Sequence, residues 1–224
     1  MKAETLTNGP PPVDVGHDAG MADPSRPSDR PPTTSTFFAV AWGERPFSGT
    51  RHEAVLFDAA DLADLTIRGA SFDGCTFRDC RFNASTLLDT ALTNCTLVRC
   101  SFFDATFKGC KLVGSQFEFG DHKLMRIEGG DWSLVAMRGA DLTEATLTGV
   151  RMREADLSGA RFDGASVRDT DLSGANLHRS SFRGSDLRGS DLSTLDPLDV
   201  EIADARIDIE QAVAIAEALG LRVG

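Results

Sequence analysis

Hydrophobic residues recur at every fifth position along most of the chain. The series runs from Phe57 to Leu192, and His122 is its one member that is not hydrophobic. A second series lies two residues earlier and consists mostly of Ala, Cys and Ser. A period of five fits neither the 3.6-residue repeat of a helix nor the two-residue repeat of a strand. The pattern therefore predicts a chain that turns a corner in every unit, with four units to a square turn.

The repeating unit resembles that of the pentapeptide-repeat family. It reads A-[DN]-L-x-x, most clearly at Ala140-Asp141-Leu142. The resemblance implies an all-β fold, a right-handed quadrilateral parallel β-helix with four units in each coil. The hydrophobic centre and the small residue two positions before it would point inward, and the other three positions would face water. Coils at the spacing of neighbouring strands, ~4.8 Å, give a rod of about 34 Å.

The pattern divides the chain into four parts. Residues 1–36 hold seven of the nine prolines and are expected to form a disordered arm. Apolar residues in 37–54 are predicted to cap the first coil, since an open stack would expose unpaired strand edges; a partner-binding peptide is the alternative. Residues 55–207 are predicted to form the β-helix. Residues 208–224 are predicted to form a dimerisation helix followed by a short strand.

The last part has the pattern of a helix with both ends marked. Asp208 followed by Gln211 matches a capping box, and Gly220 is typical of a C-terminal stop. An apolar face is expected to cover the last coil: Ile209, Ala212, Val213, Ile215, Ala216 and Leu219. We expect the tail also to bind a second copy across a two-fold axis. The predicted dimer interface consists of Ile209, Val213, Ala214, Ala218, Leu219, Leu221 and Val223.

The five cysteines all occupy the small inward series. They are Cys75, Cys80, Cys95, Cys100 and Cys110. Their spacing lacks the CxxC pairs or nearby histidines of a zinc site, so we predict core packing and no metal. The odd count and the lack of a recognisable secretory signal favour a reducing compartment over disulfides. We therefore expect a cytoplasmic protein.

His122 lies in a segment that is rich in glycine, between Gly120 and Gly129-Gly130. A histidine beside Asp121 suggests acid–base catalysis, but no nucleophile with a base can be assembled around it. We expect instead a kink or small bulge in which His122 turns outward. No phosphate-binding motif is present, so the sequence predicts no catalytic, cofactor-binding or metal-binding residues, no small-molecule substrate and no enzyme.

Acidic residues gather toward the C-terminus of a chain whose net charge is −11. Residues 55–129 hold ten acidic and eight basic residues, residues 130–200 hold twelve and eight, and residues 201–224 hold five and two. The candidate partner-binding surface is the acidic face of Asp131, Asp141, Asp156, Asp163, Asp169, Asp171, Asp186 and Asp191. An ordinary solubilising surface is the alternative. No apolar run has the length of a membrane span.

The tail narrows the resemblance to the MfpA and Qnr fluoroquinolone-resistance proteins. The similar residues run from Ala205 to Ala214 and end in Leu219-Gly220-Leu221. Those relatives are dimeric rods that imitate B-DNA, bind DNA gyrase in place of DNA, and inhibit it or spare it from quinolones. The register stays in phase without the inserted loops of the Qnr type, while the proline-rich arm departs from the pattern. The resemblance implies a gyrase-binding DNA mimic that does not itself bind nucleic acid; the alternative is a scaffolding rod for another protein partner.

Overall fold

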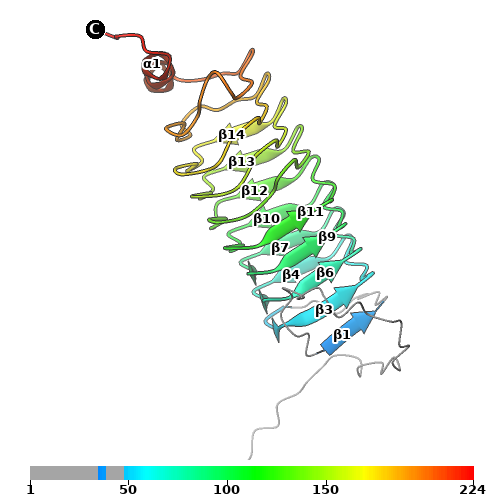
Figure 1. The fold of residues 1–224 in the computed structure, drawn as a ribbon. Coiled ribbons are helices and arrows are strands. Elements are labelled where there is room, and N and C mark those ends of the chain that lie inside the picture. The colour runs from blue at the N-terminus through cyan, green and yellow to red at the C-terminus, as the bar shows by residue number, and fades with distance from the viewer. Residues whose placement is uncertain (1–34, 39–47) are drawn as a thin grey trace, which may run out of the picture.

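The chain forms an elongated stack of coils with a helix at its C-terminal end (Figure 1). The computed structural model describes residues 35–38 and 48–224. Each strand lies on the strand of the preceding coil, and helix α1 (Ile209–Ala218) follows the last coil. None of the helical residues in the described ranges forms a segment of the length and apolarity that a membrane crossing requires.

Three faces of the stack carry parallel sheets. The first sheet contains β1 (Ser35–Phe38), β3 (Val55–Asp58), β6 (Thr76–Arg78), β9 (Thr96–Val98) and β11 (Gln116–Glu118). The second contains β4 (Thr66–Arg68), β7 (Thr86–Leu88), β10 (Thr106–Lys108), β12 (Arg126–Glu128), β13 (Thr146–Thr148) and β14 (Ser166–Arg168). The third contains β2 (Arg51–Glu53), β5 (Ser71–Asp73) and β8 (Ala91–Thr93). Isolated bridges, such as Asp61 with Arg81, join successive coils on the fourth face.

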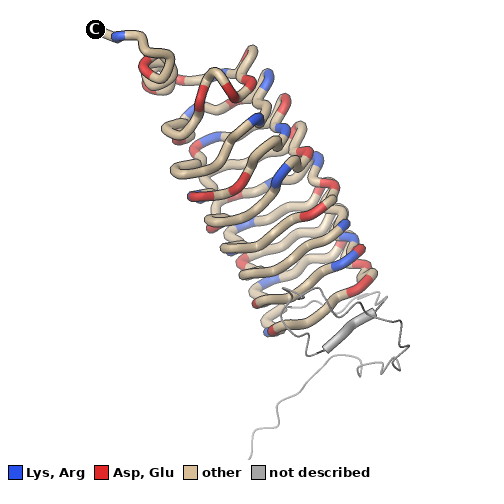
Figure 2. Tube along the Cα trace, viewed as in Figure 1, with Lys and Arg blue, Asp and Glu red and all other residues tan. Residues whose placement is uncertain are grey.

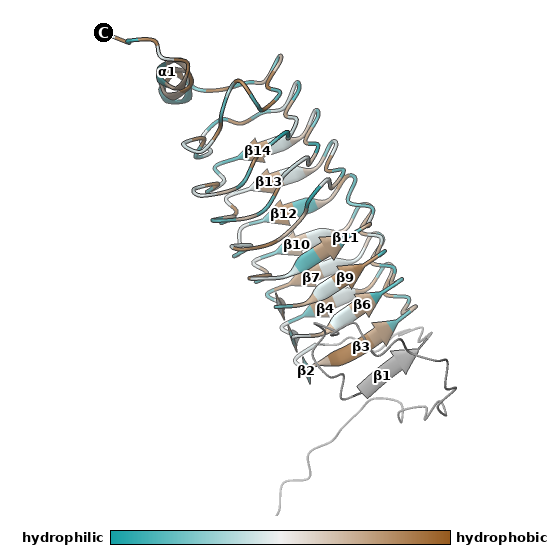
Figure 3. Cartoon of the chain, in the orientation of Figure 1, coloured by the Kyte–Doolittle hydropathy of each residue, from teal (hydrophilic) through white to brown (hydrophobic). Residues whose placement is uncertain are grey.

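Strand partners are twenty residues apart, as in the pairing of Thr76 with Thr96. This register stacks each hydrophobic centre on its equivalent in the next coil. The rings of Phe57 and Phe77 are 4.7 Å apart and nearly parallel, which is the spacing of neighbouring strands. Hydrophobic and hydrophilic residues alternate along each coil (Figure 3). The predicted four-sided parallel β-helix is confirmed, and its core is the predicted hydrophobic series.

The corner between two faces is made by the last residue of nearly every unit, which adopts a left-handed backbone. Asp79 has φ 55°, Asn94 has φ 54° and Gly139 has φ 64°. Glycine, asparagine and aspartate adopt this conformation at the least steric cost, which explains their frequency at these positions. Phe119 and Leu134 are bulky exceptions, with φ 55° and 60° and exposed side chains.

The ladder begins earlier than the predicted boundary at residue 55. Strand β1 pairs with β3 and strand β2 pairs with β5, each with the same twenty-residue offset as the later coils. The boundaries of the predicted arm and cap are therefore wrong at residues 35–38 and 51–53, because these residues belong to the ladder itself. The rest of the predicted arm and most of the predicted cap, residues 1–34 and 39–47, lie outside the described residues.

The predicted bulge at His122 is also wrong, because the side chain remains inside and only 2% of it is exposed. Its ring stacks on Phe102 at a centroid distance of 5.9 Å and meets Phe117 edge-on at 5.5 Å. Gly120 makes the room: a Cβ at that position would lie 2.9 Å from the imidazole and 2.8 Å from the Cys100 carbonyl oxygen. Because Gly120 has no side chain, the imidazole of His122 fits inside the coil and the register is not broken.

Neither ring nitrogen of His122 has a hydrogen-bond partner in the described structure, and burial lowers the pKa of His122 to about 4 despite the nearby carboxylates of Asp121 and Asp141. The unfolded chain takes up a proton near pH 6.5, whereas the folded chain does so only near pH 4. Stability should therefore be lost as the pH falls between these values, by up to roughly 3 kcal/mol.

We expect His122→Phe to remove this part of the pH dependence. Its ring would continue the stack on Phe102, and no buried nitrogen would remain. Denaturation midpoints at pH 7.5 and pH 5 should differ less in the variant than in the parent. The aspartates that also lose stability in acid are the same in both proteins, so they cancel in the comparison. Equal differences would show that His122 does not stay neutral in the folded state.

Helix α1 has the two ends that the sequence predicts. Asp208 caps it, with its carboxylate accepting from the Gln211 backbone N–H and the Gln211 side chain accepting from the Asp208 N–H. At the other end Gly220 has φ 81°, its N–H donates to Glu217, and the Leu221 N–H donates to Ala216. This is a Schellman motif. The capping box and the glycine stop are both confirmed.

The predicted packing face of the helix is wrong in part. Gln211 is buried, and its amide nitrogen donates to the carbonyl oxygens of Leu187 (2.6 Å) and Ser190 (2.7 Å) in the last coils. Ile215 packs against the core, whereas Ile209 is 83% exposed. A polar anchor therefore fixes the helix rotation. The short strand expected after the helix is absent from residues 221–224, which have no neighbouring strand to pair with in the single chain.

Candidate partner-binding surface

The eight aspartates of the predicted acidic face lie on all sides of the rod. Asp131 and Asp171 are stacked on one face, each bridged to Arg151, and Asp191 follows in the same column. The other members are distributed over the remaining faces and corners: Asp141 on the fourth face, Asp163 next to Arg161 of that face, Asp156 in line with β11, Asp186 in line with β14, and Asp169 at a corner. The structure does not gather them into one patch, and charged residues surround the rod (Figure 2).

Most of these carboxylates are paired with a cation. Asp131 lies 3.1 Å from Arg151, and Asp163 lies 3.4 Å from Arg161. The remaining pairs are Asp141 with Lys123 and Arg161, Asp156 with Arg138, Asp171 with Arg153, and Asp186 with Arg188. Asp169 and Asp191 have no ion pair among the described residues. Six of the predicted site residues are therefore partly neutralised.

Hydroxyl side chains fix several of the paired carboxylates in place. Asp171 accepts hydrogen bonds from the backbone and the hydroxyl of Ser173, and Asp131 does so from Ser133. Burial alone would raise the pKa of Asp171, but the hydrogen bonds from Ser173 and Arg153 outweigh it and hold the pKa below its ordinary value. At Asp186 the hydrogen bond from Arg188 is the main cause, and it lowers the pKa to about 2. These carboxylates are charged at neutral pH.

Carboxylates without an ion pair outnumber cations without one in the C-terminal half. Among the described residues after 130, the unpaired carboxylates are Glu144, Glu154, Asp169, Asp191, Asp196, Asp204, Asp208, Glu210 and Glu217. The unpaired arginines there are Arg168, Arg179, Arg206 and Arg222. Several of these carboxylates stand at left-handed corners, as Glu144 and Asp204 do. The free negative charge of this half therefore comes largely from residues outside the predicted acidic face.

The C-terminal tail leaves apolar side chains uncovered in the single chain. Ile209 is 83% exposed, Leu221 60%, Val223 52% and Leu219 47%. Of the other predicted interface residues, Ala214 and Ala218 are exposed and Val213 is partly buried. Leu198, which lies outside the predicted dimer interface, is also exposed. Ile209 further lines a shallow open depression with Ile207 and Ala212.

The described residues give no sign of a metal centre. All five cysteines are free and buried, and no group of three or more histidine, cysteine or acidic side chains in that part of the chain is arranged to hold a metal ion. The predicted core packing of the cysteines is confirmed. The absence of an enzymatic activity stays a prediction.

Two family models match this chain. The model of pentapeptide repeats matches in eight copies over residues 128–159, 137–174 and 155–193, and the model of the SV2A/B/C luminal domain matches residues 49–121. Comparison with curated protein sequences finds no match.

Solved structures of the same fold include two of QnrB1, described as a plasmid-mediated fluoroquinolone resistance protein. One trypsin-treated variant has 22% identity and a TM-score of 0.51, covering 85% of this chain and 100% of that one. Another has 24% identity and a TM-score of 0.53, covering 84% and 97%. HetL, from the cyanobacterium Nostoc, has 17% identity and a TM-score of 0.46, covering 80% and 90%. The repeats and the fold make this chain a pentapeptide-repeat protein, and at these identities the likeness to QnrB1 is one of fold.

Proposed function

We propose that this protein binds DNA gyrase, a type II topoisomerase, in place of DNA, and so inhibits the enzyme or shields it from fluoroquinolones. The observation that carries the proposal is the excess of unpaired carboxylates around the C-terminal half of a narrow rod. Duplex DNA likewise presents negative charge on every side of a rod. A DNA-binding surface of gyrase would therefore be matched better by charge on all sides of the rod than by a single acidic face.

The charge density of the C-terminal half supports this proposal. Residues 130–224 hold seventeen acidic and ten basic residues, a net charge of −7. Over about 20 Å of stacked coils this is roughly one charge per 3 Å. Duplex DNA carries about one charge per 1.7 Å. The near-neutral N-terminal half is a much poorer imitation, so we assign the gyrase-binding surface to the C-terminal half.

We further propose that two copies associate through their tails, in the cytoplasm. A tail-to-tail dimer would cover the exposed apolar side chains of Ile209, Leu219, Leu221 and Val223. It would also place the two acidic halves next to each other at the centre of a longer rod. In this arrangement the partner is a protein, with no direct contact to nucleic acid, membrane or small-molecule substrate.

Ile209→Glu combined with Leu221→Glu should give a folded monomer. Both side chains are exposed in the single chain, so the coils do not need them, and glutamate in the first turn suits the helix dipole. Sedimentation should show the mass of one chain, and inhibition of gyrase should weaken. The matched control is Phe119→Glu with Leu134→Glu, two exposed apolar residues of the rod body, which should remain dimeric. A tail variant that still sediments as a dimer would rule out this interface.

The direct test of the function is a supercoiling assay with purified gyrase and the full chain. We expect inhibition that weakens as salt is added, because ions screen the charges involved. The protein should not retard DNA in the absence of gyrase. A scaffolding rod would leave supercoiling unchanged at every protein concentration, and that result would overturn the proposal.

A further inference from the structure

Two pairs of cysteines face each other on neighbouring coils. Cys75 and Cys95 immediately precede β6 and β9, which pair in register. Cys80 and Cys100 immediately precede Arg81 and Ser101, which form a parallel bridge on the adjacent face. Each cysteine therefore lies directly opposite its equivalent in the next coil. The two pairs occupy consecutive inward positions of the same two coils.

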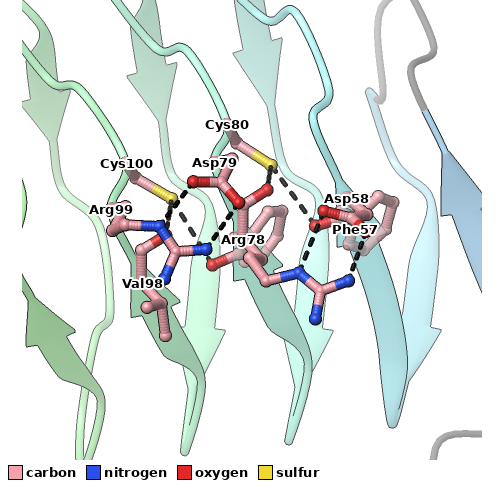
Figure 4. Close-up of polar contacts among 9 residues, drawn as sticks. Phe57, Asp58, Arg78, Asp79, Cys80, Val98, Arg99 and Cys100 are labelled. Atoms are coloured by element: carbon pink, nitrogen blue, oxygen red, sulfur yellow. Dashed lines mark hydrogen bonds and ion pairs between the residues drawn. The ribbon is translucent and has the colours of Figure 1, made fainter. Parts of the chain in front are cut away.

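The geometry of each pair suits a disulfide. Neighbouring parallel strands are about 4.8 Å apart, and disulfide-linked residues have Cα atoms about 4.4 to 6.8 Å apart. The two thiols of a pair are oriented alike: Cys75 donates to the carbonyl oxygen of His52 and Cys95 to that of Phe72, each 3.5 Å away. Figure 4 shows the Cys80 and Cys100 sulfurs on the same side of their strands, with Cys80 donating to the Phe57 carbonyl oxygen at 3.4 Å.

Core packing alone does not explain this doubled arrangement. The same inward series uses Ala or Ser at most other positions, and these are buried just as completely, as Ala105 and Ser85 are. A metal site does not explain it either, because no group of three ligating side chains is present among the described residues. Cys110 shows the contrast: its neighbours in the column, twenty residues away on either side, are Thr90 and Gly130, so it has no second thiol to meet.

We propose that Cys75 with Cys95 and Cys80 with Cys100 are two redox-sensitive thiol pairs, which hydrogen peroxide or a similarly small peroxide converts into disulfides that clamp adjacent coils together. The proposal is independent of gyrase binding. A peroxide is small enough to enter a transiently opened core, whereas a bulky disulfide such as oxidised glutathione is not.

The chemistry balances within each pair. When Cys80 is the first to lose its proton, its thiolate attacks one oxygen of hydrogen peroxide, forms a sulfenic acid and releases hydroxide. The hydroxide takes up the proton that the Cys80 thiol lost and becomes water. The sulfur of Cys100 then attacks the sulfenic sulfur, the S–S bond forms, and the hydroxyl group leaves with the Cys100 proton as a second water. Two thiols are oxidised by two electrons, and one peroxide is reduced to two waters. Cys75 and Cys95 react in the same way.

Burial disfavours the thiolate form of both members of a pair, so the thiol that first reaches solvent is the one that attacks. All four thiols are about 1% exposed, so the reaction must wait for local opening of the coils. It should be slower than oxidation of an exposed cysteine and faster in mild denaturant.

The test is to treat the full chain with hydrogen peroxide, alkylate it in strong denaturant, and map the cysteines by mass spectrometry after digestion. We expect peptides joined through Cys75 and Cys95 and through Cys80 and Cys100, with Cys110 alkylated, and full reversal by dithiothreitol. Alkylation of all five cysteines would overturn the proposal. So would sulfinic acids without cross-links, or random pairing that includes Cys110.

A matched variant separates clamping from general oxidation. Cys95→Ser with Cys100→Ser keeps the side-chain hydrogen bond to the preceding coil, since Ser115 in the same series donates to the Leu92 carbonyl as Cys95 does to that of Phe72. Peroxide should raise the thermal midpoint of the parent and leave that of the variant unchanged. An equal rise in both proteins would contradict the proposal that the disulfides clamp adjacent coils. If the variant does not fold, the mass-spectrometric map of the parent still tests whether the two disulfides form.

Discussion

Replacing Leu172 by aspartate should unfold the rod. The Leu172 side chain is 1% exposed and lies in an interior column between Met152 and Leu192. An unpaired charge in such a place costs several kcal/mol, and the total stability of a domain is only about 5 to 15 kcal/mol. Each coil also supports its neighbours, so the damage should spread beyond one coil. Circular dichroism and thermal melting should show loss of the cooperative transition.

The matched control for this substitution is Leu172→Met. Methionine has nearly the same volume and no charge, and swaps of this kind usually cost less than about 1.5 kcal/mol. The control should therefore melt cooperatively within several degrees of the parent. If the aspartate variant melted as close to the parent as the methionine variant does, the assignment of Leu172 to the interior would be wrong.

Neutralising three unpaired carboxylates in the C-terminal half should abolish or strongly weaken gyrase inhibition. The changes are Asp169→Asn, Asp191→Asn and Asp204→Asn, all at exposed positions without an ion pair in the described structure. Asparagine tolerates the left-handed backbone of Asp169 (φ 53°) and Asp204 (φ 59°), so the corners remain intact. Exposed substitutions of this kind usually change stability by no more than about 0.5 kcal/mol. A loss of inhibition would therefore come from the lost charge.

The N-terminal half offers a closely matched control triple. Asp89 and Asp64 stand in the same corner columns as Asp169 and Asp204, and they also have left-handed backbones. Asp121 corresponds to Asp191, since each accepts a hydrogen bond from the backbone N–H two residues later. Changing all three to asparagine alters the net charge by the same amount.

The concentration of protein that halves supercoiling activity should rise much more for the C-terminal triple than for this control. Equal losses would mean that only total charge matters. Unchanged inhibition by both triples would remove the DNA-mimic proposal and favour the scaffolding rod.

The repeat could be predicted from the sequence because a single period determines which residues face inward. The series from Phe57 to Leu192 needs only the spacing of residues, and the structure buries it throughout. The same period also continues backward through Phe37, Trp42, Phe47 and His52 in the sequence, which would have indicated the earlier start of the ladder. His52 does stack on Phe72, at 5.2 Å. His52 is the one polar residue in this backward extension, and it interrupts the hydrophobic series just before the predicted boundary at residue 55.

Other features depend on contacts that the period does not reveal. The inward position of His122 follows from the space that Gly120 leaves, which is a property of two positions together. The ion pair of Asp131 with Arg151 joins residues one full coil apart, so a count of carboxylates along the sequence overestimates how many of them are free of a cation. A helical wheel likewise shows the apolar faces of α1 but not its anchor, which is the polar Gln211.

The most direct test of the proposed function is competition for gyrase between this protein and linear duplex DNA. Labelled protein should bind purified gyrase, and unlabelled DNA should displace it in proportion to its occupancy of the enzyme. The labelled protein and the DNA should not bind each other when gyrase is absent. Formation of a ternary complex, with DNA and protein on the enzyme together at undiminished affinity, would contradict the claim that gyrase accepts this rod in place of DNA.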